Sequence, residues 1–313
     1  MGGGVFERVE KKYRIGSAQW RALEGVLRDH GYGVDCYGRS AITSMYWDTD
    51  DCRLICHSLE KPLYKEKVRI RSYSPDAFSS ADEDVFVELK KKFDGVVYKR
   101  RVECSLDEAC GMLSSGASRC VKTPALAALG AHARLSKQVP KAPGSTGVAA
   151  GSVQADSGSA RVSAQSAVEA MNEAELACFV DRYPALSPSV TTRCVREAWA
   201  LDPECEAVPC NQGVICACAH EPELRVTFDS QLSGRDERAG RGGDGRSCGW
   251  FPLIGEDESI LEAKAAGAFP LWFAHALGTL DIRPCSFSKC GTAFSMLAEG
   301  GSDMLQEEWK EER

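Results

Sequence analysis

Charged and apolar residues alternate along at least seven segments of this chain, and this alternation limits its fold more than any other feature. In YKEKVRIRSY, residues 64–73, lysines and arginines occupy every second position, and Val68 and Ile70 lie in the opposite phase. The pattern recurs in FERVEKKYRI, VFVELKKK, VYKRRVE, CVREAWAL, ELRVTFD and SILEAKAA. A period of two is the period of a β-strand, because successive side chains point to opposite faces. We therefore predict a sheet with one charged face and one apolar face.

The density of cations indicates where the charged face lies. A single half-polar strand normally turns its polar face to water. Here about a dozen lysines and arginines share one face, and unpaired cations at that density repel each other. We therefore expect the sheet to close into a barrel that holds a polyanion inside, with helices and loops covering its apolar outer face. The acids of the charged face are then ion-pair partners or oxygen ligands for Mg²⁺ or Mn²⁺; they are Glu10, Glu88, Glu103, Asp229 and Glu262.

A lining of this kind suits phosphoryl transfer. That reaction needs cations to hold phosphate oxygens in line and a metal to bridge them, and it needs little covalent participation by the protein. Arginine makes forked phosphate contacts, and lysine supplies a mobile point charge. The sequence has no Walker A loop, glycine-rich dinucleotide fingerprint or kinase catalytic loop. A bound nucleotide is therefore expected to be held through its phosphates.

Three helices and three insertions interrupt the predicted strands. Helices are expected at 17–31, at 107–113 with Ser105 as a cap, and at 270–280. Segments 114–167, 202–221 and 233–249 are rich in small or polar residues and are expected to be flexible. We assign residues 5–298 to a single domain that contains these insertions. Residues 300–313 are expected to form a disordered tail.

Composition excludes several classes of protein. The chain has 313 residues and a net charge of −7, which argues against a globally basic nucleic-acid binder. It has no apolar run of the roughly 18–20 residues that a membrane helix needs, and its first six residues contain no apolar h-region, so we expect no secretory leader. Its fifteen cysteines are expected to be mostly reduced thiols. One cluster lacks the paired C-x-x-C spacing of zinc sites, and a cysteine-rich surface loop is the simpler interpretation; it comprises Cys205, Cys210, Cys216, Cys218 and His220.

The alternating segments, in order, resemble a known family. It is the catalytic domain of the vacuolar transporter chaperone (VTC) complex, a polyphosphate polymerase of the triphosphate tunnel, or CYTH-like, superfamily. The matching segments are EKKYRI, MYWDTDDCRLICHSLEKP, KVRIRSY, VFVELKKK, GVVYKRRV, CVREAW, LRVTFD, ILEAKAAGAFPLW and CSFSKCGTAF. Two positions depart from the family pattern. The superfamily's E-x-E-x-K begins here with Arg8, followed by Glu10 and Lys12, and Cys194 replaces a tyrosine.

The resemblance implies a fold and an activity. The fold is α+β, an antiparallel eight-stranded closed β-barrel, or triphosphate tunnel, with flanking helices. The activity is that of an ATP:polyphosphate phosphotransferase, which adds the γ-phosphate of ATP to a growing polyphosphate chain and requires Mn²⁺ or Mg²⁺. ATP and inorganic polyphosphate are therefore the expected partners, without nucleic acid. Eukaryotic relatives carry an SPX domain and membrane helices, and we expect neither in this protein. We therefore expect a stand-alone cytoplasmic protein similar to bacterial members.

The resemblance also implies roles for individual residues. Glu262 is the expected metal ligand, with Glu88 as a weaker second. Lys289 is placed on the last strand, where it could line an exit. The expected catalytic residues are Lys12, Arg69, Arg71, Lys90, Lys99, Arg196, Arg225 and Lys264, and further phosphate or polyphosphate contacts are assigned to Arg8, Lys67, Arg101 and Lys289. For each cation the alternative is a structural ion pair inside the barrel.

Two other functions remain open. A tunnel triphosphatase would use the same lining with water as the nucleophile, and Arg8 in place of the first acid argues against it. A non-catalytic polyphosphate-binding module would need no metal ligand, and the presence of Glu262 argues against that alternative.

Overall fold

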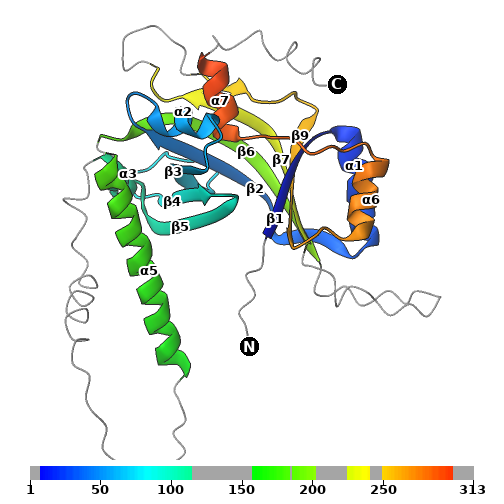
Figure 1. Ribbon diagram of the computed structural model, residues 1–313, viewed down its shortest axis with the longest axis horizontal. Coiled ribbons are helices and arrows are strands. Elements are labelled where there is room, and N and C mark those ends of the chain that lie inside the picture. Colours follow the sequence, from blue (N-terminus) through cyan, green and yellow to red (C-terminus); the bar gives the residue numbers. More distant parts are fainter. Residues whose placement is uncertain (1–7, 115–156, 184, 202–223, 240–248, 299–313) are drawn as a thin grey trace, which may run out of the picture.

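The computed structural model describes residues 8–114, 157–183, 185–201, 224–239 and 249–298. In these residues it is a mixed α+β fold, with six helices around one antiparallel sheet of nine strands (Figure 1). The strands lie in the order β1-β9-β7-β6-β2-β3-β4-β5, and β8 pairs with β7. The strands are β1 (Arg8–Gly16), β2 (Tyr32–Asp48), β3 (Tyr64–Ser72), β4 (Asp84–Phe93), β5 (Val96–Ser105), β6 (Ser187–Leu201), β7 (Leu224–Asp236), β8 (Phe251–Pro252) and β9 (Glu258–Ala266). The helices are α1 (Ser17–Asp29), α2 (Arg53–Leu59), α3 (Leu106–Ser114), α5 (Ser157–Arg182), α6 (Leu271–Thr279) and α7 (Lys289–Ala298).

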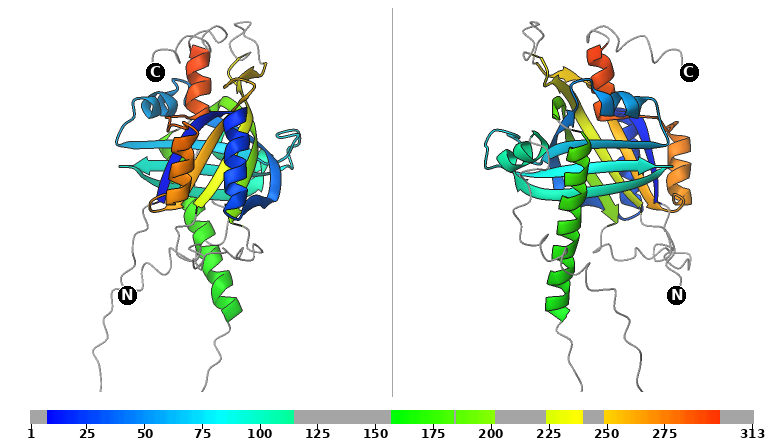
Figure 2. Two further views of the ribbon diagram at one scale, coloured as in Figure 1. Left: turned by 90° about the vertical axis from the view of Figure 1, so that its right-hand side faces the viewer. Right: turned by 60° about the vertical axis from the view of Figure 1, so that its left-hand side comes forward.

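The sheet curls so that its two ends face each other across its charged side. In strand order five strands separate β1 from β4, yet Glu10 and Lys12 of β1 act electrostatically on Lys90 of β4. The right-hand view of Figure 2 shows β3, β4 and β5, in cyan, crossing in front of the rest of the sheet. The predicted inward orientation of the charged face is therefore confirmed. We call this side of the sheet the inner face.

The prediction of a closed eight-stranded barrel is wrong. Eight long strands are present, but among the described strands β1 pairs only with β9, and β5 pairs only with β4. The other edge of β1 is taken by the segment before α7. Tyr13 forms a bridge with Pro284, and the Cys285 N–H donates to the Lys12 carbonyl at 2.7 Å. At the β5 edge the Asn172 side chain of α5 donates to the Arg101 carbonyl at 3.2 Å. The two edges thus meet other parts of the chain and not each other.

Helices α1 and α6 cover the outer face of β1, β7 and β9. Leu23 and Leu27 of α1 and Phe273 of α6 are completely buried in one apolar cluster with strand residues such as Phe228. The Trp20 ring stacks on Phe228 with a centroid separation of 5.1 Å. Helix α1 ends where the sequence predicts, because Gly31 adopts a φ of +76°, which allows the chain to turn back into β2.

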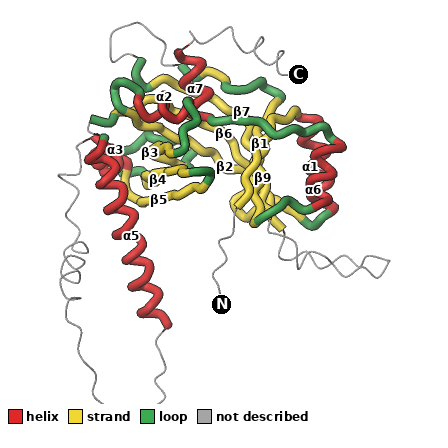
Figure 3. Tube along the Cα trace, in the orientation of Figure 1, coloured by secondary structure: helices red, strands yellow, loops and turns green. Residues whose placement is uncertain are grey.

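Helices α3 and α5 cover the other end of the outer face. Ser105 and Glu108 bond to each other's backbone N–H groups at 3.3 and 3.0 Å, which confirms the predicted cap of α3. Leu176 and Phe179 of α5 pack against the strand residues Val68 and Val87. Helix α5 extends well beyond the sheet (Figures 1 and 3).

Helices α2 and α7 lie over one end of the inner face. Asp48, at the end of β2, accepts hydrogen bonds from the Leu54 and Ile55 N–H groups of α2, both at 2.9 Å. Cys290 of α7 packs against Ile55 and against Tyr46. Tyr46 lies directly opposite Arg69 in the sheet and therefore belongs to the inner face. The two helices thus close part of this face.

The placement of α7 corrects one prediction. Lys289 does not lie on a strand; it is the first residue of α7. The Ser288 Oγ accepts the Gly291 N–H at 3.2 Å, and its carbonyl accepts the Thr292 N–H at 2.7 Å. Ser288 thus caps a helix at the point where the sequence suggests a strand.

The predicted insertions fall largely on residues that the structure does not describe. Helix α5 begins at Ser157, inside the predicted segment 114–167, and β7 runs to Asp236, inside the predicted segment 233–249. Residues 202–221, the cysteine cluster of Cys205 to His220, and the tail 300–313 lie outside the described residues. No helix in the described ranges is both long enough and apolar enough to cross a membrane.

The packing of α5 can be tested at Phe179. Its side chain is completely buried, so Phe179→Ala should lower the free energy of unfolding by about 3–5 kcal/mol. Val168, on the same helix, is 50% exposed, and Val168→Ala should change stability by less than about 0.5 kcal/mol. Urea unfolding of both variants measures the difference. Equal effects would show that α5 is not docked on the sheet in solution.

Candidate functional site

The carboxylate of Glu88 in β4 holds one group of cations on the inner face. Its side chain is only 1% exposed. Arg69 Nε and Nη2 donate to Oε2 at 2.9 and 2.7 Å, and Lys99 Nζ and Arg101 Nε lie 2.6 and 2.9 Å from Oε1. Burial would raise the pKa of Glu88, but these cations, Arg69 foremost, hold the pKa well below its usual range. We call these four residues the Glu88 cluster.

Tyr46 and Arg71 border the Glu88 cluster. Arg69 Nη1 donates to the Tyr46 hydroxyl at 3.0 Å, and Arg71 Nε donates to Ser44 Oγ at 3.2 Å. Arg71 Nε also lies 3.9 Å from Glu88 Oε2. Burial alone would raise the pKa of Tyr46, but the neighbouring cations, led by Arg69, lower it. Two predicted arginines thus lie side by side with their guanidinium groups fixed by hydrogen bonds.

Asp229 of β7 organises a second group of cations. Its carboxylate is fully buried and accepts both Arg196 Nε and Nη2, at 2.6 and 2.7 Å. Lys289 Nζ bonds to the same carboxylate from α7. Burial would raise the pKa of Asp229, but Lys289 and Arg196 hold the pKa well below its usual range. The helix α7 is therefore tied to the inner face by an ion pair.

Glu262 of β9 lies next to this group. Lys264 Nζ is 2.7 Å from Oε1, and Arg196 Nη2 is 3.5 Å from Oε2. Burial would raise the pKa of Glu262, yet Lys264 and Lys12 lower it to about 2. Lys12 Nζ donates to the Phe287 carbonyl at 3.0 Å. We use the name Asp229–Glu262 cluster for the two acids and the four cations around them, which are Lys12, Arg196, Lys264 and Lys289.

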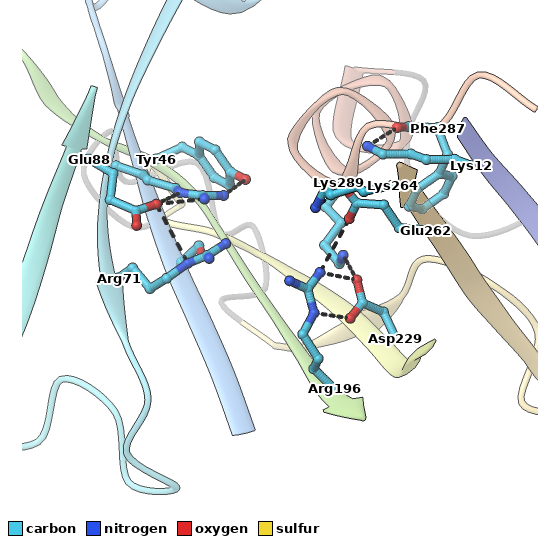
Figure 4. Close-up of polar contacts among 12 residues, drawn as sticks. Lys12, Tyr46, Arg71, Glu88, Arg196, Asp229, Glu262, Lys264, Phe287 and Lys289 are labelled. Carbon is cyan, nitrogen blue, oxygen red and sulfur yellow. Dashed lines mark hydrogen bonds and ion pairs between the residues drawn. The ribbon is translucent and has the colours of Figure 1, made fainter. Parts of the chain in front are cut away.

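The two clusters lie on opposite sides of the inner face (Figure 4). The Glu88 cluster comes from β3, β4 and β5, and the Asp229–Glu262 cluster comes from β1, β6, β7, β9 and α7. Lys67 and Lys90, from the first side, lie directly opposite each other on β3 and β4. In the described part of the chain neither lysine makes an ion pair or a hydrogen bond. The pKa of Lys90 is lowered to about 8, chiefly by burial and also by the charges of Lys12, Lys67 and Arg69, against the opposing effect of Glu10. Lys67 and Lys90 therefore have no acidic partner among the described residues, and Lys90 is influenced by residues of both clusters.

Among the predicted residues that the structure describes, Arg225 lies apart from the inner-face contacts. Arg225 lies at the beginning of β7, where its side chain is 47% exposed and pairs with Asp35 at 3.0 Å. Arg8 begins β1 opposite Ala266, and its side chain is outside the described part of the chain.

Two residues of the site were not predicted as site residues. Asp229 was recognised only as an interspersed acid, although its phase in ELRVTFD places it with the cations. Tyr46 is two residues from Ser44, which lies opposite Arg71, so the alternation of residues places Tyr46 on the face that carries the arginines. A tyrosine in a strand is usually a packing residue, and only the Arg69 contact distinguishes this one.

Of the two predicted metal ligands, Glu262 has surroundings that suit a divalent metal and Glu88 does not. Both oxygens of Glu88 already accept hydrogen bonds from cations, which opposes the predicted metal role. Glu262 lies close to Glu10 of the neighbouring strand, and neighbouring carboxylate oxygens suit Mg²⁺ or Mn²⁺. The described residues contain no group of three or more histidine, cysteine or acidic side chains that could hold a metal. A metal at Glu10 and Glu262 would therefore need further oxygens from its substrate.

Comparison with known proteins identifies the family. The family model for the VTC domain matches residues 7–206, which is well over half of the chain. The chain therefore belongs to the VTC domain family. The match covers β1 to β6 and ends before Asp229, Glu262 and Lys289. No curated protein matches the sequence.

Solved structures give only distant likenesses. A candidate adenylate cyclase from Bacillus halodurans is 12% identical, with a TM-score of 0.38, over 90% of this chain and 93% of that one. A second candidate adenylate cyclase, from Vibrio parahaemolyticus, is 10% identical, with a TM-score of 0.38, over 93% of this chain and 98% of that one. Likenesses at this level carry no argument about fold or function.

The Glu88 cluster yields a stability prediction. Glu88→Gln removes a buried charge that three cations share, so it should destabilise the protein by about 3–5 kcal/mol at pH 7. Because the folded pKa of Glu88 is lowered, its contribution is complete above the unfolded pKa near 4.5 and declines as the pH falls below that value. The gap between wild type and variant should therefore shrink in acid.

Chemical unfolding between pH 3 and pH 7 measures this gap. Glu103→Gln is the matched control, because Glu103 lies exposed on the same strand pair. A gap that stays constant down to pH 3 would contradict the ion-pair explanation.

Proposed function

We propose that this chain is a metal-dependent polyphosphate polymerase that transfers the γ-phosphate of ATP to a growing polyphosphate chain on the inner face. The proposal is carried by Lys67 and Lys90, which lie between two groups of fixed cations and have no acidic partner among the described residues. Membership of the VTC domain family supports it. Such an arrangement favours a ligand with many closely spaced negative charges, because each new anionic group relieves repulsion already present.

The chain's own residues divide between holding and neutralising phosphate. Guanidinium groups fixed by Glu88 and Asp229 have a set orientation and suit contacts to defined phosphate oxygens. Lysine carries a point charge on a flexible stem, so Lys67 and Lys90 suit the transferred group, whose position changes during the reaction. In this proposal the phosphate-holding residues are Arg69, Arg71, Lys99, Arg101 and Arg196, and Lys12, Lys264 and Lys289 add positive charge from the other side. Arg8 and Arg225 remain peripheral candidates.

The proposed transfer needs no general base. A terminal oxygen of the polyphosphate chain, already anionic, attacks the γ-phosphorus of ATP and forms the new P–O bond. The bond between that phosphorus and the β–γ bridging oxygen breaks, and ADP leaves with the electron pair. The cations of both clusters stabilise the charge on the transferred group. A Mn²⁺ or Mg²⁺ ion held by Glu262 and Glu10 would neutralise phosphate oxygens and help to align them.

Product analysis tests the activity. Purified wild-type protein, incubated with ATP and Mn²⁺, should yield phosphate chains that a gel resolves. Glu262→Gln should lower the rate by roughly 100-fold or more, because it removes charge at the proposed metal position. Lys11→Gln is the matched control, since Lys11 adjoins Lys12 but lies exposed on the opposite face. Thermal unfolding of both variants separates loss of activity from loss of fold.

The products also distinguish the alternatives. Free phosphate without chains would indicate a tunnel triphosphatase and overturn the polymerase proposal. Binding of polyphosphate without any product from ATP would indicate a non-catalytic module.

Lys90 gives a pH prediction for ligand binding. Its pKa is lowered to about 8, so the ammonium charge is lost as the pH rises through that value. The affinity of wild type for tripolyphosphate should then fall relative to Lys90→Arg, whose guanidinium stays charged, by up to about tenfold per pH unit. Calorimetry from pH 7 to pH 9.5 measures the ratio of the two affinities, which cancels ionisation of the ligand. A ratio independent of pH would contradict a role for Lys90 in phosphate binding.

A further inference from the structure

Three lysines lie at the exposed end of β3 and β4, beyond the Lys67–Lys90 pair. Lys65 and Lys92 are directly opposite each other across these strands. They are two residues from Lys67 and Lys90, so both pairs lie on the inner face. Lys61 precedes β3 and is exposed. We call Lys61, Lys65 and Lys92 the lysine mouth.

The lysine mouth lacks acidic partners in the described residues. Lys65 Nζ donates to the Ser58 carbonyl at the end of α2, at 3.1 Å, and neither Lys61 nor Lys92 forms an ion pair there. Two acids adjoin these lysines in the sequence and have other partners: Glu60 lies 3.4 Å from His57 Nδ1, and Glu66 pairs with Arg182 at 3.0 Å. At the other end of the same strands, Arg71 and Arg101 both approach Glu88. Among the described residues, the inner-face cations of these neighbouring strands are therefore paired with Glu88 at one end and lack an acidic partner at the other.

Burial and the positive charges around the mouth both lower the pKa of Lys65. Burial lowers the pKa of its amine, and the neighbouring charges of Lys67, Lys92 and Lys61 lower it further. Such crowding costs free energy unless an anion is bound. The mouth thus resembles the Lys67–Lys90 region in its charge and continues it outward.

We propose that the lysine mouth binds the outer part of a linear polyphosphate chain, beyond the residues that hold the transferred phosphate. This inference rests on the proposed function, which supplies the ligand. The two lysine pairs are about 7 Å apart along the strands, the span of two residues. A linear polymer with a charge on every phosphate can contact both pairs at once. A single triphosphate engaged with the two clusters leaves the mouth empty.

The surroundings of the mouth favour polyphosphate over nucleic acid. Single-stranded nucleic acids are held by aromatic side chains that stack on bases. The aromatic residues at this end are Tyr64, Phe93 and Tyr98. Their register places them on the outer face, with Tyr64 opposite Phe93 and Tyr98 opposite Lys91. At this end of the strands, the face that carries the lysines therefore offers charge without a stacking surface.

The test compares a short and a long ligand on one double variant, Lys65→Gln with Lys92→Gln. Its affinity for long-chain polyphosphate should fall about tenfold at low salt, and the dependence of log affinity on log salt should become shallower by about two. Its affinity for tripolyphosphate should stay within about twofold of wild type. The matched control is Lys11→Gln with Arg21→Gln, which removes two exposed cations from elsewhere. Thermal unfolding of both double variants verifies that the fold is retained.

Three results would overturn the inference. They are an equal loss for both ligands, no loss for either, and an equal loss for single-stranded DNA of matched charge. The readout is binding, so it does not depend on turnover. If wild type makes chains but the long-chain affinity is unchanged in the variant, the proposed role of the lysine mouth is wrong and the proposed polymerase activity is supported. If wild type makes no chains but the variant selectively loses affinity for long-chain polyphosphate, the proposed role of the lysine mouth is supported and the proposed polymerase activity is wrong.

Discussion

Lysine and arginine side chains that face inward from a curved sheet repel one another, and three buried carboxylates determine where this repulsion is relieved. Two like charges about 5 Å apart cost about 3 kcal/mol at an effective dielectric constant of about 20. Glu88 and Asp229 each neutralise a group of cations and fix the guanidinium groups in place. Glu262 does the same for Lys264. Lys67 and Lys90 are outside the reach of these acids, so the arrangement of the carboxylates creates a place for an anion.

The alternation of residues predicts much of this arrangement. A strand's period fixes which residues share a face, so the side chains of Arg69, Lys90 and Arg196 could be assigned to one face before any contact was known. The period gives no information on which edges of the sheet meet. Closure was therefore predicted and does not occur, because the segment at Pro284 and Cys285 occupies one of the edges. For the same reason Lys289 was placed on a strand, although Ser288 starts a helix there.

The site spans the boundary of the family match. The Glu88 cluster lies within residues 7–206, and Asp229, Glu262 and Lys289 lie after them. What unites the two parts is the sheet itself. Strands β7 and β9 insert between β6 and β1, so carboxylates from the later part of the chain reach the same face as the earlier cations. Residues that are far apart in the sequence, such as Glu262 and Lys12, are therefore neighbours in the sheet.

The contact between β1 and Pro284 has a consequence for the behaviour of the protein in concentrated solution. An unpaired strand edge exposes a row of N–H and C=O groups that can recruit a strand from another molecule. Here the chain covers part of its own edge, and the covering residue is a proline, which has no N–H to offer a further strand. The single bridge at Tyr13 and the Cys285 hydrogen bond thus protect β1 without extending the sheet. The segment that keeps the sheet from closing on itself also guards this edge against aggregation.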